Sequence, residues 1–292
     1  MSYIVTTENA FSQVAAPNLP LATPQYDAKY LDQLNNVLRL YFNQLDKIIG
    51  QLKTGSGSID GTGIRFPYGA FHQDGTTTLT TSITNNSTTP VVVGSTASFP
   101  ASGWFLIESE IIAYTGKTTT SFTGITRGVL GTTNVAHTAG VAISEVQGTG
   151  SPTTIGTVLF NNTDYSNQVT ASTNFDRVNF AVAGLYNLQL SVQLLNFTTS
   201  EDNVTLWLRK NGSDVAQSAG VVQVNSKHGA SPGAVIASWN YFLDMAVNDY
   251  VQLAWTSDTG NTVVSTLPAG TTPVHPASPA LIFTAQFVSA LP

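Results

Sequence analysis

The chain has 292 residues, a formal net charge of −6 and only 10% charged residues, well below the ~25% that is usual for soluble domains. It has no cluster of Lys and Arg that could neutralise phosphates, which argues against a nucleic-acid-binding protein. The absence of cysteine excludes disulfides, thiolate metal sites and cysteine nucleophiles. Such a weakly charged surface is typical of β-structure and of proteins that assemble.

The first segment, residues 1–24, contains three prolines and no hydrophobic periodicity. We expect an extended arm that becomes ordered against a partner and anchors the protein. It lacks a basic segment followed by a continuous apolar run, so no secretory signal is predicted. No apolar run in the chain reaches the ~20 residues needed to span a bilayer, and we expect synthesis in a cytoplasm.

A helix is predicted over residues 25–53, with Thr23 as N-cap and Pro24 as the first helical residue. Its apolar positions alternate spacings of three and four, which is the seam of a heptad repeat: Leu31, Leu34, Leu38, Tyr41, Leu45, Ile48 and Leu52. The helix could pack on its own domain, or it could serve oligomerisation or docking. We favour the second interpretation because a Gly/Ser linker, residues 54–65, follows at once.

Two β-regions are predicted after the linker: a small antiparallel module over residues 66–147 and a larger domain over residues 148–292. Within the second region GTGSP (148–152) reads as another linker. From Tyr186 the chain alternates strictly between apolar residues and Asn, Gln or Ser as far as Leu194. Successive side chains of a strand point to opposite faces, so this run predicts a strand with one apolar and one amide-rich side.

Other strands are predicted at 204–210, 237–245, 249–255 and 279–291. The pair Asn211–Gly212 between two of them suits a type I′ hairpin turn. Several such strands at this spacing indicate a sandwich or barrel.

Catalytic and metal-binding patterns are weak. His72, His137, His228 and His275 are scattered, so no metal site is predicted. Glu108 and Glu110 are two residues apart, which places them on one face of a strand. They could imitate an acid–base pair, but a solvated strand face is the interpretation we favour.

Asp202, flanked by Glu201 and Asn203, is predicted to lie in a turn between strands. Clustered oxygen ligands could hold calcium there, but a plain turn is the preferred interpretation. No cofactor site and no enzymatic activity are predicted.

The C-terminal half resembles the C1q/TNF-like jelly-roll family. The matching segments, in order, are AVAGLYNLQLSVQL (181–194), VTLWLRKNGSDVAQS (204–218), FLDMAVNDYVQLAW (242–255) and PALIFTAQFVSAL (279–291). The resemblance implies a compact homotrimer with apolar strand faces between subunits. The residues expected in the jelly-roll core or trimer interface are Tyr186, Leu188, Leu190, Val192, Trp207, Trp239, Tyr241, Trp255, Phe283 and Phe287.

Trp207 is out of phase with its apolar neighbours Leu206 and Leu208, so it is expected to face away from the core. A subunit interface is the interpretation we favour for such aromatic residues; the core and a glycan contact are the alternatives. The loops 196–203, 225–233 and 258–278, which are small and mostly uncharged, are candidate contact loops for a target.

A second resemblance links the chain to virion proteins of tailed phages. FPYGAFHQDGTTTLTT (66–81), joined to NVTLWLRKNGSDV (203–215) and VIASWNYFLDMAVNDYVQLAW (235–255), is similar to such proteins. FLIESEIIAYTGKTTTSFTGITRGVLGTTNVAHTAG (105–140) resembles a short β-module that recurs in phage particle and tail proteins. Because the former proteins usually lack that module, its presence here looks like an insertion.

Together these resemblances imply a non-enzymatic, trimeric virion structural protein, mainly β in fold. We expect residues 1–53 to bind other virion proteins of the tail or capsid and the β-module to form a stalk or collar. The jelly-roll head would then attach to a host surface, with surface glycan as one potential ligand. The alternative is a capsid decoration or head-fibre protein that braces the shell. A glycan depolymerase is less favoured, because neither a carboxylate pair in a groove nor a repetitive β-helix is evident.

Overall fold

The computed structural model describes residues 17–19, 28–54, 66–271 and 273–290. The chain divides into two compact units, residues 67–288 and the remainder. In the N-terminal unit, α1 (Ala28–Thr54) confirms the predicted helix. The arm (apart from residues 17–19), the predicted cap Thr23–Pro24 and the linker residues 55–65 lie outside the described residues.

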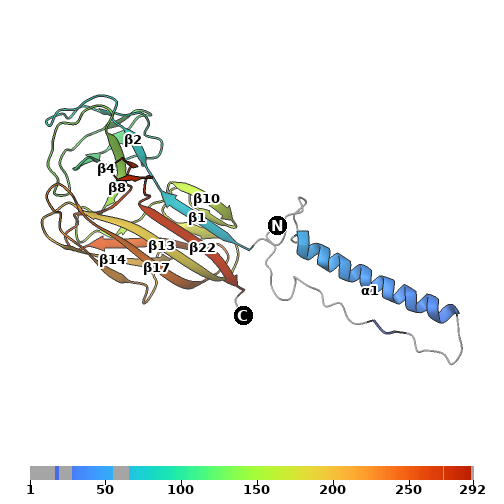
Figure 1. The fold of residues 1–292 in the computed structure, drawn as a ribbon. Helices are drawn as coiled ribbons and strands as arrows, with labels where there is room; N and C mark the ends of the chain where they lie inside the picture. Colours follow the sequence, from blue (N-terminus) through green and yellow to red (C-terminus); the bar gives the residue numbers. More distant parts are fainter. Residues whose placement is uncertain (1–16, 20–27, 55–65, 272, 291–292) are drawn as a thin grey trace. The chain divides into compact units, whose positions relative to one another are not determined.

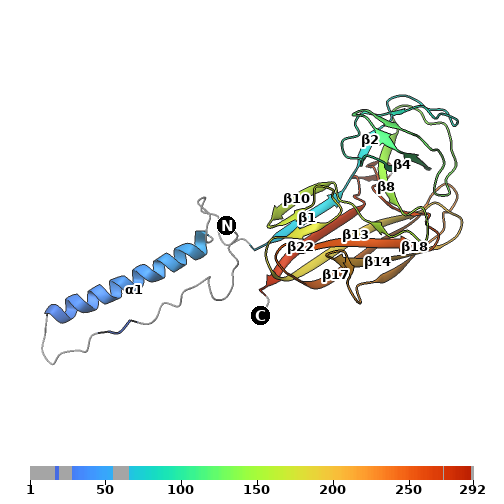
Figure 2. The same cartoon turned by 180° about the vertical axis from the view of Figure 1, so that it is seen from behind.

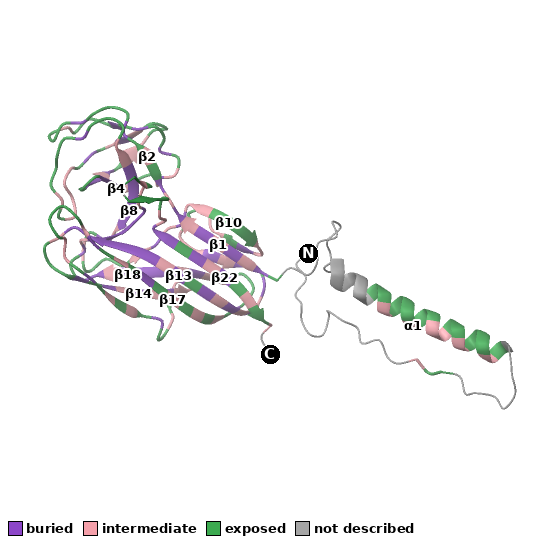
Figure 3. Cartoon of the chain, viewed as in Figure 1, coloured by how far each residue is buried: buried purple, intermediate pink, exposed green. Residues whose placement is uncertain are grey.

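The helix α1 keeps its apolar seam accessible. None of its described side chains, residues 29–47, is buried, and Leu31 is 38% exposed; Figure 3 shows these residues as exposed or intermediate. No helix among the described residues combines the length and the apolarity needed to cross a membrane.

The second unit is mainly β, as predicted, and is built from curled antiparallel sheets (Figure 1). One sheet contains the neighbours β10-β1-β22-β13, and β17 lies on the other side of β13. The views in Figures 1 and 2 agree that β1, β22 and β13 lie side by side. The strands are β1 (Tyr68–Gln73), β10 (Asn162–Asn167), β13 (Gly184–Asn196), β17 (Gly233–Met245) and β22 (Leu281–Ser289).

A second sheet, in the order β11-β12-β18-β14 with β16 and β15 beside β14, faces the first. The turn Asn211–Gly212 joins β14 to β15 with positive φ at both residues, 52° and 80°, as the predicted type I′ turn requires. The strands are β9 (Gly156–Thr157), β11 (Val169–Ala171), β12 (Val178–Phe180), β14 (Asp202–Lys210), β15 (Ser213–Asp214), β16 (Gly220–Val224) and β18 (Tyr250–Ser257).

The core of the two sheets follows from the alternation in sequence. Along β13 the apolar residues Tyr186, Leu188 and Leu190 are buried, whereas Gln189 is exposed. Burying one large apolar side chain stabilises a fold by about 1.5–3 kcal/mol. Aromatic rings fill one part of this core, where Phe71, Phe160 and Phe283 contact one another.

The strand β1 pairs with β10 and β22 although it lies in the range that the sequence assigns to the β-module. We therefore call β1 together with residues 156–289 the head, and residues 76–148 the insert. The insert leaves the head after β1 and returns before β9. Its strands are β2 (Thr76–Thr78), β3 (Val91–Val92), β4 (Gly103–Ile107), β5 (Glu110–Tyr114), β6 (Gly116–Lys117), β7 (Ser121–Thr123) and β8 (Ala142–Gly148).

The insert has its own apolar core, in which the rings of Phe105, Tyr114 and Phe122 pack with centroids 4.6–6.0 Å apart. The three aromatic residues belong to the segment that carries the resemblance to phage particle modules. Gly124 and Gly128 in the same segment adopt positive φ, 65° and 62°. A Cβ at Gly124 would lie only 1.9 Å from Oγ1 of Thr115, so this turn requires glycine.

Strand pairing and a shared apolar cluster join the insert to the head. The strand β8 pairs with β19 (Thr262–Ser265), which also pairs with the end of β13. An apolar cluster crosses the junction and contains Leu106, Ile111 and Val146 of the insert; the head contributes Leu195, Phe197 and Val263. Within the predicted linker 148–152, Gly148 ends β8 and pairs with Val263 of β19.

A small hairpin follows β19 in the head. It consists of β20 (Gly270–Thr271) and β21 (Val274–His275). Two backbone hydrogen bonds of 2.9 Å between Leu267 and Ser278 close its base.

Candidate interaction face

The side of β13, β17 and β22 that points away from the head core carries a single charged residue, Asp244 near the end of β17, which lies opposite Leu185. No Asp, Glu, Lys or Arg occurs in 185–191, 234–242 or 281–289. Since alternate residues of a strand share a face, the burial pattern assigns these side chains to the outer face, as we call it: Leu185, Asn187, Gln189, Ser191, Ile236, Ser238, Asn240, Phe242, Ile282, Thr284, Gln286 and Val288.

Apolar side chains are exposed at several points of the outer face. Ile236 is 64% and Phe242 61% exposed on β17, and Ile282 (45%) and Val288 (49%) are exposed on β22. Single exposed apolar residues are common on protein surfaces, but several on neighbouring strands of one weakly charged sheet face indicate an interaction site.

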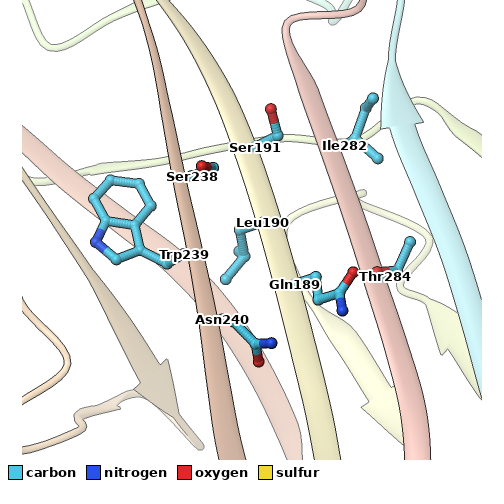
Figure 4. A pocket seen from close by; sticks show the side chains of 8 residues that line it. All are labelled: Gln189, Leu190, Ser191, Ser238, Trp239, Asn240, Ile282 and Thr284. Carbon is cyan, nitrogen blue, oxygen red and sulfur yellow. The ribbon is translucent and has the colours of Figure 1, made fainter.

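An open hollow of about 450 Å³ lies in the middle of the outer face. In Figure 4 the side chain of Gln189 on β13 extends toward Thr284 on β22. Asn240 lines the hollow from β17. The remaining lining residues are Leu190, Ser191, Ser238, Trp239 and Ile282. Amides, hydroxyls and apolar groups together offer hydrogen bonds and shape but no charge.

One polar atom on the outer face has no partner within the described chain. The side-chain oxygen Oδ1 of Asn187, opposite Phe242 in the strand register, is buried and accepts no hydrogen bond from the described residues. A buried acceptor without a donor typically costs about 1–3 kcal/mol.

The residues expected in the jelly-roll core or trimer interface mostly face inward. The first group is fully buried in the head core and contains Tyr186, Leu188, Leu190, Val192, Trp255 and Phe283. A second group is partly buried against that core and contains Trp239, Tyr241 and Phe287. The exposed residues of the outer face were missed; the available signal was that β17 is apolar on both faces.

Trp207 faces away from the core, as its phase predicts. It lies on the outer side of the second sheet and is not among the buried core residues. Its indole Nε1 donates a hydrogen bond of 2.8 Å to Asp214, whose carboxylate is also 3.0 Å from Nε of Arg209. Trp207 is thus on a different surface from the outer face of β13.

Polar residues of the insert meet in a buried ion-pair network. Glu110 is fully buried, and Arg127 donates from Nε and Nη2 to its two oxygens at 2.7 and 2.8 Å. His137 Nε2 lies 2.8 Å from the same carboxylate, and His137 Nδ1 lies 2.6 Å from Glu108. The amides of Gly128 and Val135 also donate to Glu110.

The expected solvated strand face is therefore wrong for Glu110. Glu108 lies with Ser109 in the two-residue turn between β4 and β5, has φ of 52°, and does not share a strand face with Glu110. Burial alone would raise the pKa of Glu110, but hydrogen bonds from Arg127, His137 and Val135 outweigh it and lower the pKa. A carboxylate saturated in this way holds loops together and is unavailable as an acid–base catalyst.

Asp202 also has a different role from the expected turn. It begins β14, is buried, and accepts hydrogen bonds from the hydroxyls of Ser257 and Thr262 and the amide of Thr259. Burial would raise its pKa, but these donors lower it below the usual range. Its oxygens anchor the loop between β18 and β19 instead of facing a cation.

The other histidine with carboxylate contacts, His72 on β1, lies 2.9 Å from Asp164 and 3.4 Å from Asp74 through different ring nitrogens. Across the described ranges, no group of three or more His, Asp or Glu residues is arranged to hold a metal ion. No protein-family model matches the chain, and no curated protein matches it either.

Proposed function

We propose that this chain is a non-enzymatic, homotrimeric structural protein of a tailed-phage particle. Residues 1–53 attach it to other virion proteins, and the head is a jelly roll that takes part in attachment to a host surface. The proposal rests on the two sequence resemblances and on the physical features of the outer face. The weakly charged outer face, with its exposed apolar residues, carries the proposal most directly.

The strand order of the head supports a jelly roll. The sheet β10-β1-β22-β13-β17 faces the sheet β11-β12-β18-β14-β16. The strand pairs β1–β10, β11–β12, β13–β17, β14–β16 and β14–β18 are antiparallel. The chain passes between the two sheets repeatedly, from β13 to β14, from β16 to β17 and from β17 to β18. Such crossings are typical of two-sheet jelly rolls.

The outer face suits an interface between copies of the chain. It combines a depleted charge with the exposed side chains Ile236 and Phe242, and subunit interfaces have the same composition in their centres. In the N-terminal unit, the accessible seam of α1, with Leu34, Leu38 and Leu45 partly exposed, suits a second contact between copies or with the particle.

The oligomeric state of the full chain tests this proposal. We expect a trimer in sedimentation and light scattering, and Ile236→Asp should weaken it more than tenfold because a charge would be buried in the interface. Val221→Asp is the matched control, since Val221 is 68% exposed on β16 of the other sheet. A stable wild-type monomer, or equal effects of the two variants, would contradict the proposed interface.

The position on the particle decides between attachment and capsid decoration. Antibody against residues 153–292 with immunogold labelling of intact particles should mark the tail if the protein is a fibre or adhesin. Labelling spread over the capsid would favour the decoration alternative. In that case, loss of the protein should lower the temperature at which the capsid opens.

A further inference from the structure

The N-terminal unit and the insert are connected to opposite ends of the head. The N-terminal unit is joined to the head at Pro67, whose carbonyl accepts a hydrogen bond of 3.0 Å from Phe287 near the end of β22. The start of β1 and the end of β22 therefore share one end, which we call the base. The other end of both strands is marked by the pair Gln73 and Leu281.

The insert begins at the end of the head opposite to the base. The chain leaves β1 at Gln73 and soon enters β2, which pairs with β8. In this pairing Thr78 lies opposite Ala142, the first residue of β8. The chain then extends to the bridge between Ile83 and His137, near the loops 84–90 and 132–136. Figure 1 shows the insert at the far end of β1 from the C-terminal end of β22.

The candidate contact loops of the head lie at the same end as the insert. The end of β13 is fixed there, because Gln193 N donates to the carbonyl of Ala280 at 2.9 Å. The loops 196–203, 225–233 and 258–278 start or finish at this end of β13, β17 and β22. The β8–β19 pairing and the apolar junction join the insert to this end of the head.

We propose that this end, formed by the insert loops 80–90 and 132–140 and the hairpin β20–β21, is the surface that binds a protein on the target cell. This inference rests on the proposed attachment function and replaces the expected stalk role of the module. In this inference the insert is not a stalk between anchor and head, because the chain enters the head at Pro67 and the insert follows β1.

The exposed chemistry of this end favours a protein partner. Residues 80–90 contain only Thr, Ser, Asn, Ile and Pro, and Val274 in the hairpin is 87% exposed, the highest value among the large apolar residues described. Sugars typically bind on exposed aromatic rings. The exposed aromatic residues described, Phe42, Phe66, Tyr165, Phe175 and Phe242, lie outside these loops. Adaptable hydroxyl and amide groups around an apolar contact are instead typical of protein-binding loops.

The test measures binding of the purified full chain to cells of the host strain. We expect Val274→Asp in β21 and Asn86→Lys in the insert to reduce binding at least tenfold. Val247→Asp is the matched control, because Val247 is 43% exposed in the loop between β17 and β18 at the base. It should change binding less than twofold, and all three variants should keep the wild-type circular dichroism spectrum and oligomeric state.

The possible outcomes separate the two proposals. If the wild-type chain does not bind cells, the attachment function itself fails. If it binds and Val247→Asp alone weakens binding, attachment stands and the proposed surface is wrong. Protease treatment of the cells should abolish binding. Binding that resists protease but is lost after periodate oxidation of surface sugars would overturn the assignment of a protein partner.

Discussion

The head and the insert reach a folded core by different means. The head has long strands, thirteen residues in β13 and in β17, whose alternating apolar side chains form one large cluster. The insert has strands of two to seven residues and adds a buried network of Glu110, Arg127 and His137 to its aromatic core. Short strands bury little apolar surface, so the insert depends on polar contacts to fix its loops.

The polar network is the most sensitive point of the insert. Arg127→Ala should destabilise the insert by about 3–5 kcal/mol, because the buried Glu110 would lose its guanidinium partner and keep only His137 and two backbone amides. Hydrogen exchange should show faster exchange of the amides of β5, while the amides of β14 in the head keep their protection. Unchanged protection of β5 would show that the network does not hold the insert together.

The outer carboxylate of the same network provides the control. Glu108 is 53% exposed, and exposed ion pairs contribute about 0–1 kcal/mol. Glu108→Gln should therefore have little effect on exchange.

The head should respond to loss of apolar packing instead. Leu188→Ala should lower the free energy of unfolding by about 2–5 kcal/mol, because Leu188 is fully buried in the core between the two sheets. Urea unfolding followed by the fluorescence of Trp255, in a variant that lacks the other tryptophans, measures this change. A loss below 1 kcal/mol would mean that the head core repacks easily.

The junction between the two regions should respond to pH. Burial raises the pKa of Glu145 to about 8, although the hydrogen bond from Gln73 and the charge of Lys117 oppose the shift and Asp74 adds to it. The folded state holds this proton more tightly than the unfolded state, whose pKa is 4.5. The contribution is thus fully present below pH 4.5 and is lost as pH rises to about 8, with a total on the order of a few kcal/mol.

Glu145→Gln tests this prediction, because the amide cannot ionise. The wild-type melting temperature should fall between pH 5 and pH 8.5 more steeply than that of Glu145→Gln, and the variant should be the more stable protein at pH 8.5. Parallel curves would mean that Glu145 does not titrate in this range.

The strands of the head were predictable because their signal is local. The alternation from Tyr186 to Leu194 specifies both a strand and its buried side, and Asn211–Gly212 specifies a turn. The helix α1 was predictable for the same reason, from the spacing of Leu31 to Leu45.

The polar sites were not predictable, because they depend on residues that are far apart in sequence. Glu110 meets His137 across 27 positions, and Asp202 meets Thr262 across 60; neither spacing follows from periodicity. The pairing of β1 with β22 brings together residues more than 200 positions apart, such as Gln73 and Leu281. No local pattern could therefore indicate that Tyr68–Gln73 belongs to the head.

The position of β1 also determines how the protein would carry a mechanical load. If the anchor holds Pro67 and a target holds the insert, tension runs along β1 from one end to the other. Backbone hydrogen bonds in an antiparallel sheet lie across the strand direction, so the five pairings of β1 with β10 would be loaded together in shear and not opened one after another. The same strand that separates the two ends of the head thus resists their being pulled apart.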